Sequence, residues 1–125
     1  MHYLCIAYVV LTDNAQIYYK MILEKIKSPA DVKKLDVAQL ESLAGEMRNA
    51  LIDKLSACGG HVGSNLGMVE ATVALHYVFN SPVDKIVFDV SHQSYAHKIL
   101  TGRKEAFMNP AHYNDVSGYS EPTES

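Results

Sequence analysis

Several features that would assign a sequence to a common functional class are missing from this chain. It has only two cysteines, Cys5 and Cys58, which lie far apart and form no Cys-x-x-Cys pair. That pattern suits a reducing compartment better than a disulfide scaffold, so we expect a cytoplasmic protein. Lysine and arginine total 11 against 14 acidic residues and form no basic stripe, so the charge pattern predicts no nucleic-acid partner.

A long hydrophobic run is also missing. The apolar run from Leu4 to Leu11 holds eight residues, less than half of the roughly 20 that a helix needs to cross a bilayer. The three residues before it include no lysine or arginine, and no good cleavage site follows it. We therefore expect no membrane span and no secretory signal. Residues 1–20 are interpreted as an extension of unknown role, with a short buried strand as the alternative.

The composition that remains is that of one globular domain at most. The chain has 125 residues, of which 48% are hydrophobic and 20% charged, and its formal net charge is -3. It is long enough to bury a modest core. It contains no internal repeat and no low-complexity tract, and neither common nucleotide-binding fingerprint is present.

The first strong local signal is a helix that begins near Asp36. The pattern Asp36-x-x-Gln39 is a variant of the capping box, in which side chains of the first turn bond to free backbone N–H groups. The apolar residues that follow at spacings of three and four share one helix face: Leu40, Leu43, Met47, Leu51 and Leu55. Gly59-Gly60 ends the pattern, because glycine accepts the left-handed conformation that closes a helix.

A second helix is predicted over residues 67–79, followed by a strand over residues 85–90. The helix is apolar on most sides, so we expect it to be buried, and the Asn-Ser-Pro sequence at 80–82 ends it. The strand, from Lys85 to Val90, is apolar on both faces, and such a strand needs parallel neighbours and covering helices. A short helix over residues 94–100 follows and is ended by the Thr-Gly pair at 101–102.

These elements predict an α/β fold with a parallel sheet covered by helices, of which this chain holds only the opening part. A single strong strand leaves backbone donors and acceptors unpaired on both edges. The tail over residues 108–125 is polar, contains two prolines and shows no periodicity. The chain is therefore either the front of a larger domain or a subunit that completes its sheet with another chain.

Two loops that contain histidine carry the candidate chemistry. In the first, Gly59 to Gly67 reads Gly-Gly-His-Val-Gly-Ser-Asn-Leu-Gly, and a glycine-rich turn before a helix can present N–H groups to an anion. The second places His92 just past the carboxyl end of the expected strand, where open α/β sheets bind ligands. Histidine can donate or accept a proton near neutral pH. For both His61 and His92, the alternative is a side chain that only bonds to the loop backbone.

Three motifs in order resemble those of the 1-deoxy-D-xylulose-5-phosphate synthase family, thiamine-diphosphate enzymes of the transketolase superfamily. They are residues 60–67 (Gly-His-Val-Gly-Ser-Asn-Leu-Gly), residues 69–79 (Val-Glu-Ala-Thr-Val-Ala-Leu-His-Tyr-Val-Phe) and residues 89–103, which begin Asp-Val-Ser-His-Gln. The resemblance implies that residues 21–125 are the amino-terminal part of a thiamine-diphosphate-binding domain. Many family members have glycine where Ser91 stands, so this chain departs from the family beside His92.

The resemblance also implies a reaction. Members of the family join pyruvate to glyceraldehyde 3-phosphate with loss of carbon dioxide, giving 1-deoxy-D-xylulose 5-phosphate for isoprenoid, thiamine and pyridoxal synthesis. The parent protein would then be a cytoplasmic, homodimeric transferase that uses thiamine diphosphate and Mg2+. His92 would contact the cofactor near its reactive ring and assist proton transfers, and His61 would line the substrate pocket as the second catalytic residue.

Other parts of the family's cofactor site are not in this sequence. The Gly-Asp-Gly segment that binds Mg2+ and the diphosphate is not among these 125 residues. We therefore assign no metal ligand and expect the isolated chain to lack synthase activity. Two alternatives remain: a non-catalytic association module, or one subunit of a split transketolase-like enzyme whose companion chain carries the magnesium motif.

Four further polar residues have ordinary structural explanations. His97 and Lys98 are interpreted as solvated or helix-end residues, because they fall on a short helix. His76 lies in an apolar helix and is interpreted as a core histidine with satisfied hydrogen bonds. Arg103 is either a phosphate-binding residue or part of the packing at a helix end.

Overall fold

The computed structural model describes residues 22–124. The expected extension over residues 1–20, with its alternative of a buried strand, lies outside the described residues. Within the described range the α-helices are α2 (Pro29–Val32), α3 (Val37–Cys58), α4 (Val62–Gly67), α5 (Val69–Val78), α6 (Tyr95–Lys98) and α7 (Glu105–Met108). A π-helical turn, η1 (Ile99–Arg103), and two 3-10 helices, η2 (Pro110–Asp115) and η3 (Pro122–Glu124), complete them. One more helical turn covers residues 22–25.

The long helix α3 forms where the sequence predicts it. Asp36 Oδ1 accepts a hydrogen bond from Gln39 N at 2.8 Å, and Gln39 Oε1 accepts one from Asp36 N at 3.0 Å. This reciprocal pair confirms the capping box. Gly59 follows the helix with φ 73°, in the half of conformational space that glycine enters at low cost, and its N–H bonds to Leu55 O.

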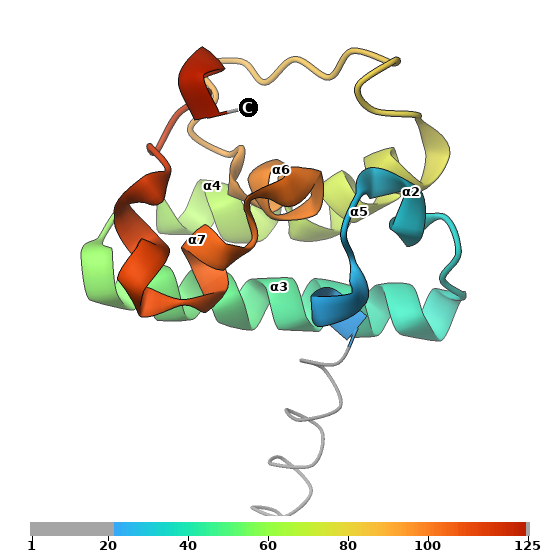
Figure 1. Ribbon diagram of the computed structural model, residues 1–125, viewed down its shortest axis with the longest axis horizontal. Helices are drawn as coiled ribbons and strands as arrows, with labels where there is room; N and C mark the ends of the chain where they lie inside the picture. The colour runs from blue at the N-terminus through green and yellow to red at the C-terminus, as the bar shows by residue number, and fades with distance from the viewer. Residues whose placement is uncertain (1–21, 125) are drawn as a thin grey trace, which may run out of the picture.

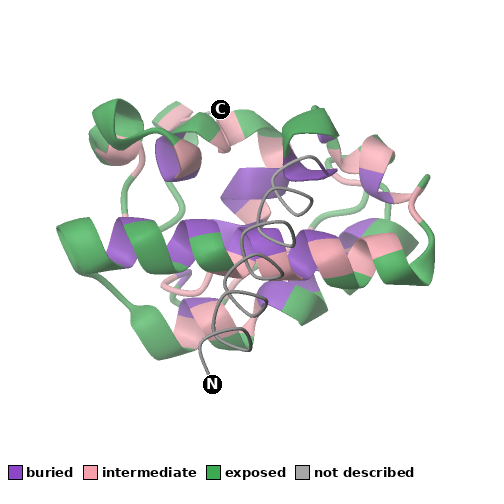
Figure 2. Cartoon of the chain, turned by 90° about the horizontal axis from the view of Figure 1, so that it is seen from below, coloured by how far each residue is buried: buried purple, intermediate pink, exposed green. Residues whose placement is uncertain are grey.

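The other helices pack on one side of α3 (Figure 1), so the apolar face of α3 lies at the centre of the core. Figure 2 shows buried residues recurring along the helix. The apolar residues of α3 that are buried are Leu43, Ala44, Met47, Ala50, Leu51 and Leu55. They meet apolar side chains from α5, α6, η1 and α7, namely Val69, Val73, Tyr95, Ala96, Ile99, Leu100, Ala106 and Phe107. Burial of these apolar side chains away from water is the main contribution that stabilises the packing of α3 against the other helices.

The second predicted helix is present as α5, with two differences from the prediction. Residues 62–67, which the sequence suggested were a loop, form the short helix α4 directly before it. Helix α5 buries one face only, through Val69, Thr72, Val73 and His76. Its last residues, including Val78, are exposed. The prediction that this helix is buried on most sides is therefore wrong for the described residues.

The predicted strand is absent, and the parallel sheet with it. Residues 85–88 form no regular structure, and residues 22–124 contain no β-strand at all. The segment belongs to the loop between α5 and α6 that arches away from α3 in Figure 1. Val87 is 89% exposed, and Val90 has a positive φ of 58° that extended backbone does not have. A strand is stable only when a neighbour pairs with its backbone N–H and C=O groups, and the described chain offers no neighbour here. The prediction of an α/β fold is therefore wrong for the described residues, which form a helical structure.

Two lysines tie the carboxyl-terminal part to the rest. Lys54 Nζ, on α3, donates to Ala106 O at 3.0 Å and also to Tyr113 O, and it lies 5.0 Å from the centre of the Phe107 ring. Desolvation in this environment lowers the pKa of Lys54. Lys104 Nζ donates to the carbonyls of Leu23 and of two neighbouring residues, Glu24 and Ile26. These contacts between distant segments fix the position of the chain that follows α6.

Candidate functional site

The two histidine loops lie against each other. His61 is the residue before α4, with φ −80° and ψ 97°, so its backbone is still extended where the helix begins. His92 follows Val90 and Ser91, which both have positive φ. The ring centres of His61 and His92 are 5.3 Å apart, and the rings meet edge to face at 75°. Residues that sequence analysis selected separately are thus neighbours, although their catalytic roles stay predictions.

A tyrosine from the carboxyl-terminal segment completes this cluster. The Tyr119 ring lies 5.5 Å from the His61 ring at an interplanar angle of 67°. His61 therefore touches two aromatic rings from segments that are far apart in the sequence. Sequence analysis missed Tyr119, because the tail in which it lies has no periodicity that would place it.

Asn65, on α4, connects the two loops through its amide. Its Nδ2 donates to His61 O at 2.6 Å and to His92 O at 3.1 Å. Its Oδ1 accepts from Tyr95 N at 3.1 Å. Asn65 is 1% exposed, so these groups face protein rather than solvent. Sequence analysis quoted Asn65 inside a motif but gave it no role.

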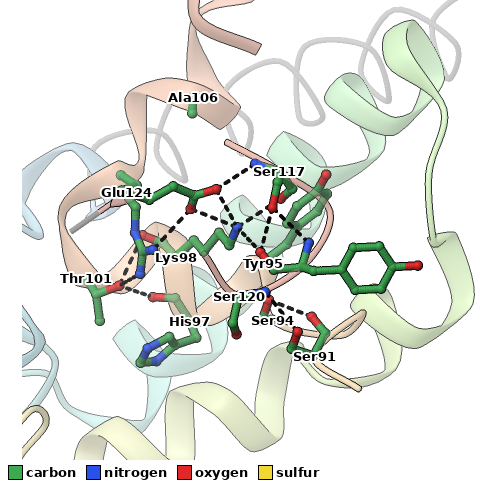
Figure 3. Close-up of polar contacts among 12 residues, drawn as sticks. Ser91, Ser94, Tyr95, His97, Lys98, Thr101, Ala106, Ser117, Ser120 and Glu124 are labelled. Carbon is green, nitrogen blue, oxygen red and sulfur yellow. Dashed lines mark hydrogen bonds and ion pairs between the residues drawn. The ribbon is translucent and has the colours of Figure 1, made fainter. Parts of the chain in front are cut away.

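Ser91 lies directly before His92, at the end of the loop that connects α5 to α6. It has φ 66°, the left-handed region that glycine adopts more easily than serine. Its carbonyl accepts a hydrogen bond from Ser94 Oγ at 2.8 Å, and its own Oγ accepts one from Ser120 N at 2.8 Å (Figure 3). The hydroxyl, which glycine lacks, thus holds the segment that brings Tyr119 to His61.

Two polar atoms in the second loop lack a hydrogen-bond partner. His92 Nδ1 and Gln93 Oε1 are both buried, and neither atom has a hydrogen-bond partner within the described part of the chain. Buried polar atoms normally find a partner, because leaving one unpaired costs about 1–3 kcal/mol. These two atoms thus have hydrogen-bonding capacity that the described residues do not use.

A second histidine pair lies deeper in the structure. His76 Nε2 and His97 Nδ1 are 2.9 Å apart, and their rings are stacked with centres 5.0 Å apart. Burial lowers the pKa of both side chains, with the value for His97 falling to about 4. The prediction of a core histidine is confirmed in part for His76, which is fully buried, but its Nδ1 has no partner among the described residues. His97 was predicted to be a solvated or a helix-end residue; it bonds within the structure, so the solvated alternative is wrong, and its place in the last turn of α6 agrees with the helix-end alternative.

Lys98 pairs with Glu124 (Figure 3). Arg103 joins the same carboxylate, and the three side chains form a buried ionic cluster. Lys98 Nζ lies 2.8 Å from Glu124 Oε2 and donates to Ser117 O at 2.9 Å. Arg103 Nη1 lies 3.2 Å from the same Glu124 oxygen. Burial alone would raise the pKa of Glu124, but hydrogen bonds from Lys98 and Ser117 N outweigh it and lower the pKa. Lys98 is 1% exposed, so of its two predicted roles the solvated one is wrong, whereas its position at the end of α6 agrees with the helix-end one. For Arg103 the contacts favour packing over phosphate binding.

Two pockets flank His97. One, of about 290 Å³, is bounded by Ser94, His97, Lys98, Arg103 and residues 120–122. The other, of about 460 Å³, lies under the apolar loop and is bounded by Ile86, Val87, Phe88, Val90, Ser91, His97 and Ser120. Neither pocket includes His61 or His92.

The described residues contain neither a cluster of metal ligands nor a helix that could span a membrane. Between residues 22 and 124, no three histidine, cysteine, aspartate or glutamate side chains gather closely enough to hold a metal ion. No helix in that same range has the length and apolar character needed to cross a bilayer.

Comparison with known proteins finds 1-deoxy-D-xylulose-5-phosphate synthases among the relatives of this chain. A protein-family model described as 1-deoxy-D-xylulose-5-phosphate synthase matches residues 23–125. Over 104 residues the chain is 55% identical to the 1-deoxy-D-xylulose-5-phosphate synthase of Caldanaerobacter subterraneus subsp. tengcongensis and 58% identical to that of Corynebacterium diphtheriae. It is 56% identical over 105 residues to that of Chlamydia pneumoniae. These matches cover 83% of this chain but only 16–17% of each relative. The chain thus spans about one sixth of the length of the relatives it matches.

Proposed function

The chain belongs to the 1-deoxy-D-xylulose-5-phosphate synthase family, and from that premise we propose that it supplies the amino-terminal part of such a synthase. The complete enzyme is a transferase of the transketolase class that joins pyruvate to glyceraldehyde 3-phosphate with loss of carbon dioxide. Residues 21–125 are the first part of its thiamine-diphosphate-binding domain, and residues 1–20 are an extension.

The observation that carries the proposal is the contact between His61 and His92. The ring centres of His61 and His92 are 5.3 Å apart, so two imidazoles, the side chain most often used as a general acid or base, lie side by side. A pair of this kind can take a proton from one position of a substrate and return it at another.

The fit to thiamine diphosphate is partial. When bound, the cofactor supplies the electron sink that decarboxylation of a 2-oxo acid requires. His92 Nδ1 and Gln93 Oε1, buried and without a partner in the described structure, can exchange hydrogen bonds with such a group. By the family resemblance, His92 would contact the cofactor and move protons, and His61 would orient the substrate carbonyl or hydroxyl beside it.

The magnesium-diphosphate end of the site is assigned to the remaining five sixths of the family's length. No group of three potential ligands lies within residues 22–124, and the sequence contains no Gly-Asp-Gly segment. We assign Mg2+, the homodimer contact and a cytoplasmic location to the parent enzyme on the family resemblance. The isolated chain is expected to bind the cofactor weakly and to be inactive.

The experiment compares the chain alone with a chimera. In the chimera, residues 23–125 replace the matching segment of the Caldanaerobacter relative, which is 55% identical. Both proteins are titrated with thiamine diphosphate and Mg2+ in a calorimeter. The proposal predicts saturable binding by the chimera and weak binding or none by the chain alone. Failure of a folded chimera to bind the cofactor would contradict it, as would tight binding by the chain alone that His92→Ala does not weaken.

A further inference from the structure

Asn65 has more specific contacts than its place in a short helix requires. One bond, from Nδ2 to His61 O, is local, because it joins positions four apart. The other two reach His92 O and Tyr95 N, which lie 27 and 30 positions away. A residue that only stabilised the start of α4 would not need partners in the second loop.

The three contacts together require a side chain with an amide group. Two backbone carbonyls need two donors, and one backbone N–H needs an acceptor, on a side chain of this length. An asparagine side chain offers two N–H donors and one carbonyl oxygen, so all three contacts are satisfied at once. Aspartate has the same shape but no donor when ionised, and it would turn negative oxygens toward both carbonyls.

The contacts act on the two histidines through their backbone. Asn65 fixes the carbonyl of each histidine, and Tyr95 N anchors the chain three positions after His92. Holding these groups on one buried side chain fixes the distance between the two loops. We propose that Asn65 is a positioning residue that sets the 5.3 Å separation of the His61 and His92 rings. The catalytic use of that separation rests on the proposed function, whereas the positioning does not.

The test is made on the chain itself by NMR. Asn65→Asp keeps the size of the side chain and removes both donors, and Asn65→Ala removes all three contacts. Two variants serve as controls. Asn49→Ala removes an exposed asparagine from α3, and Leu43→Ala opens the core at a fully buried side chain of α3. The readouts are the nuclear Overhauser effect between the two imidazole rings and hydrogen exchange at the Tyr95 amide.

The unmodified chain is expected to show a nuclear Overhauser effect between the His61 and His92 rings. Both Asn65 variants should lose it. Asn65→Ala, which also removes the acceptor of the Tyr95 N–H, should exchange that amide about tenfold faster, the factor that corresponds to one lost hydrogen bond, whereas Asn65→Asp keeps an acceptor oxygen there. Both control variants should keep the ring contact, although Leu43→Ala lowers overall stability. A ring contact that survives in a folded Asn65→Asp variant would overturn the proposal, and so would an equal loss in Leu43→Ala.

A second measurement covers variants that fail to fold. In the unmodified chain, the side-chain amide protons of Asn65 are expected to exchange much more slowly than those of the exposed Asn49. They should also show cross-peaks to the α-protons of both His61 and His92. Fast exchange, or cross-peaks to one loop only, would overturn the proposal without any variant. Neither readout depends on cofactor binding, so the positioning role and the proposed function can fail separately.

Discussion

His76 Nε2 and His97 Nδ1 share one hydrogen bond of 2.9 Å between two stacked rings. One nitrogen must donate and the other accept, so the tautomers of the two rings are coupled. If each ring gained a proton, two positive charges would lie next to each other in a buried environment. The pair is therefore stable only while at least one ring is neutral.

The first prediction concerns stability between pH 7.5 and pH 5. The folded-state pKa of His97 is lowered to about 4 and that of His76 is lowered as well, so the unfolded chain takes up protons first as the pH falls. Stability is complete above the unfolded pKa of about 6.5 and is lost as the pH falls from there toward 4. We expect the free energy of unfolding, from urea denaturation, to decrease by about 1 kcal/mol at pH 5, a value reduced for the partial exposure of His97.

The control for this prediction is His97→Gln. It removes the group whose pKa is lowered most, and the range above pH 5 avoids most carboxylate titration. The variant should lose clearly less stability over the same range. An equal loss in the variant would show that other groups cause the pH dependence.

The second prediction concerns Glu124. Glu124→Gln leaves the ammonium of Lys98 buried without its counter-charge, and breaking a buried pair by removing one partner typically costs about 3 kcal/mol. Urea denaturation at pH 7 measures the loss. Glu121→Gln, an exposed neighbour, is the matched control and should change stability by less than about 0.5 kcal/mol. A loss below about 1 kcal/mol for Glu124→Gln would mean that solvent replaces the carboxylate.

The third prediction concerns the cap of α3. Asp36→Ala removes the side chain that accepts from Gln39 N, and loss of such a cap costs about 1 kcal/mol. Asp53→Ala removes an exposed aspartate from the same helix and is the control. Thermal unfolding followed by circular dichroism compares them. Equal midpoints for the two variants would show that the capping box adds no stability.

The fourth prediction concerns Ser91→Gly, which restores the residue found in many family members. Glycine removes the strain of a positive φ at serine, worth roughly 1–2 kcal/mol. It also removes the hydroxyl that accepts from Ser120 N, worth roughly 0.5–1.5 kcal/mol. The unfolding free energy should therefore change little, while the Ser120 amide exchanges faster with solvent. Unchanged exchange at Ser120 would mean that the serine hydroxyl does not hold the carboxyl-terminal segment.

The parts of the fold that sequence analysis predicted correctly depend on local patterns. Asp36 and Gln39 are three positions apart, and the leucines of α3 repeat within one helix, so both signals lie inside the element they define. The predicted strand failed because a strand depends on partners elsewhere in the chain. The apolar composition of residues 85–90 indicates a preference, but the described chain has no neighbouring strand to satisfy it.

The site was predictable to a similar degree. His61 and His92 stood out because each lies in a distinctive motif, but their contact also involves Asn65 and Tyr119. Asn65 lies in the same motif as His61 and Tyr119 in the polar tail, and the roles of both depend on partners from other segments, which no local pattern indicates. Lys98 was misjudged for the same reason, since a lysine on a short helix normally faces solvent, and its acceptors lie in residues 117–124.

The most direct test of the account is the rate at which the chimera described above converts pyruvate and glyceraldehyde 3-phosphate to 1-deoxy-D-xylulose 5-phosphate. His92→Ala and His61→Ala are compared in it with His112→Ala, an exposed histidine outside the cluster. The account predicts an active chimera in which loss of either cluster histidine lowers kcat/KM by about 100-fold or more, the range for a general acid or base, while His112→Ala has no effect. An active chimera that keeps its rate without His61 or without His92 would contradict the central claim that these two residues form the catalytic half-site of this chain.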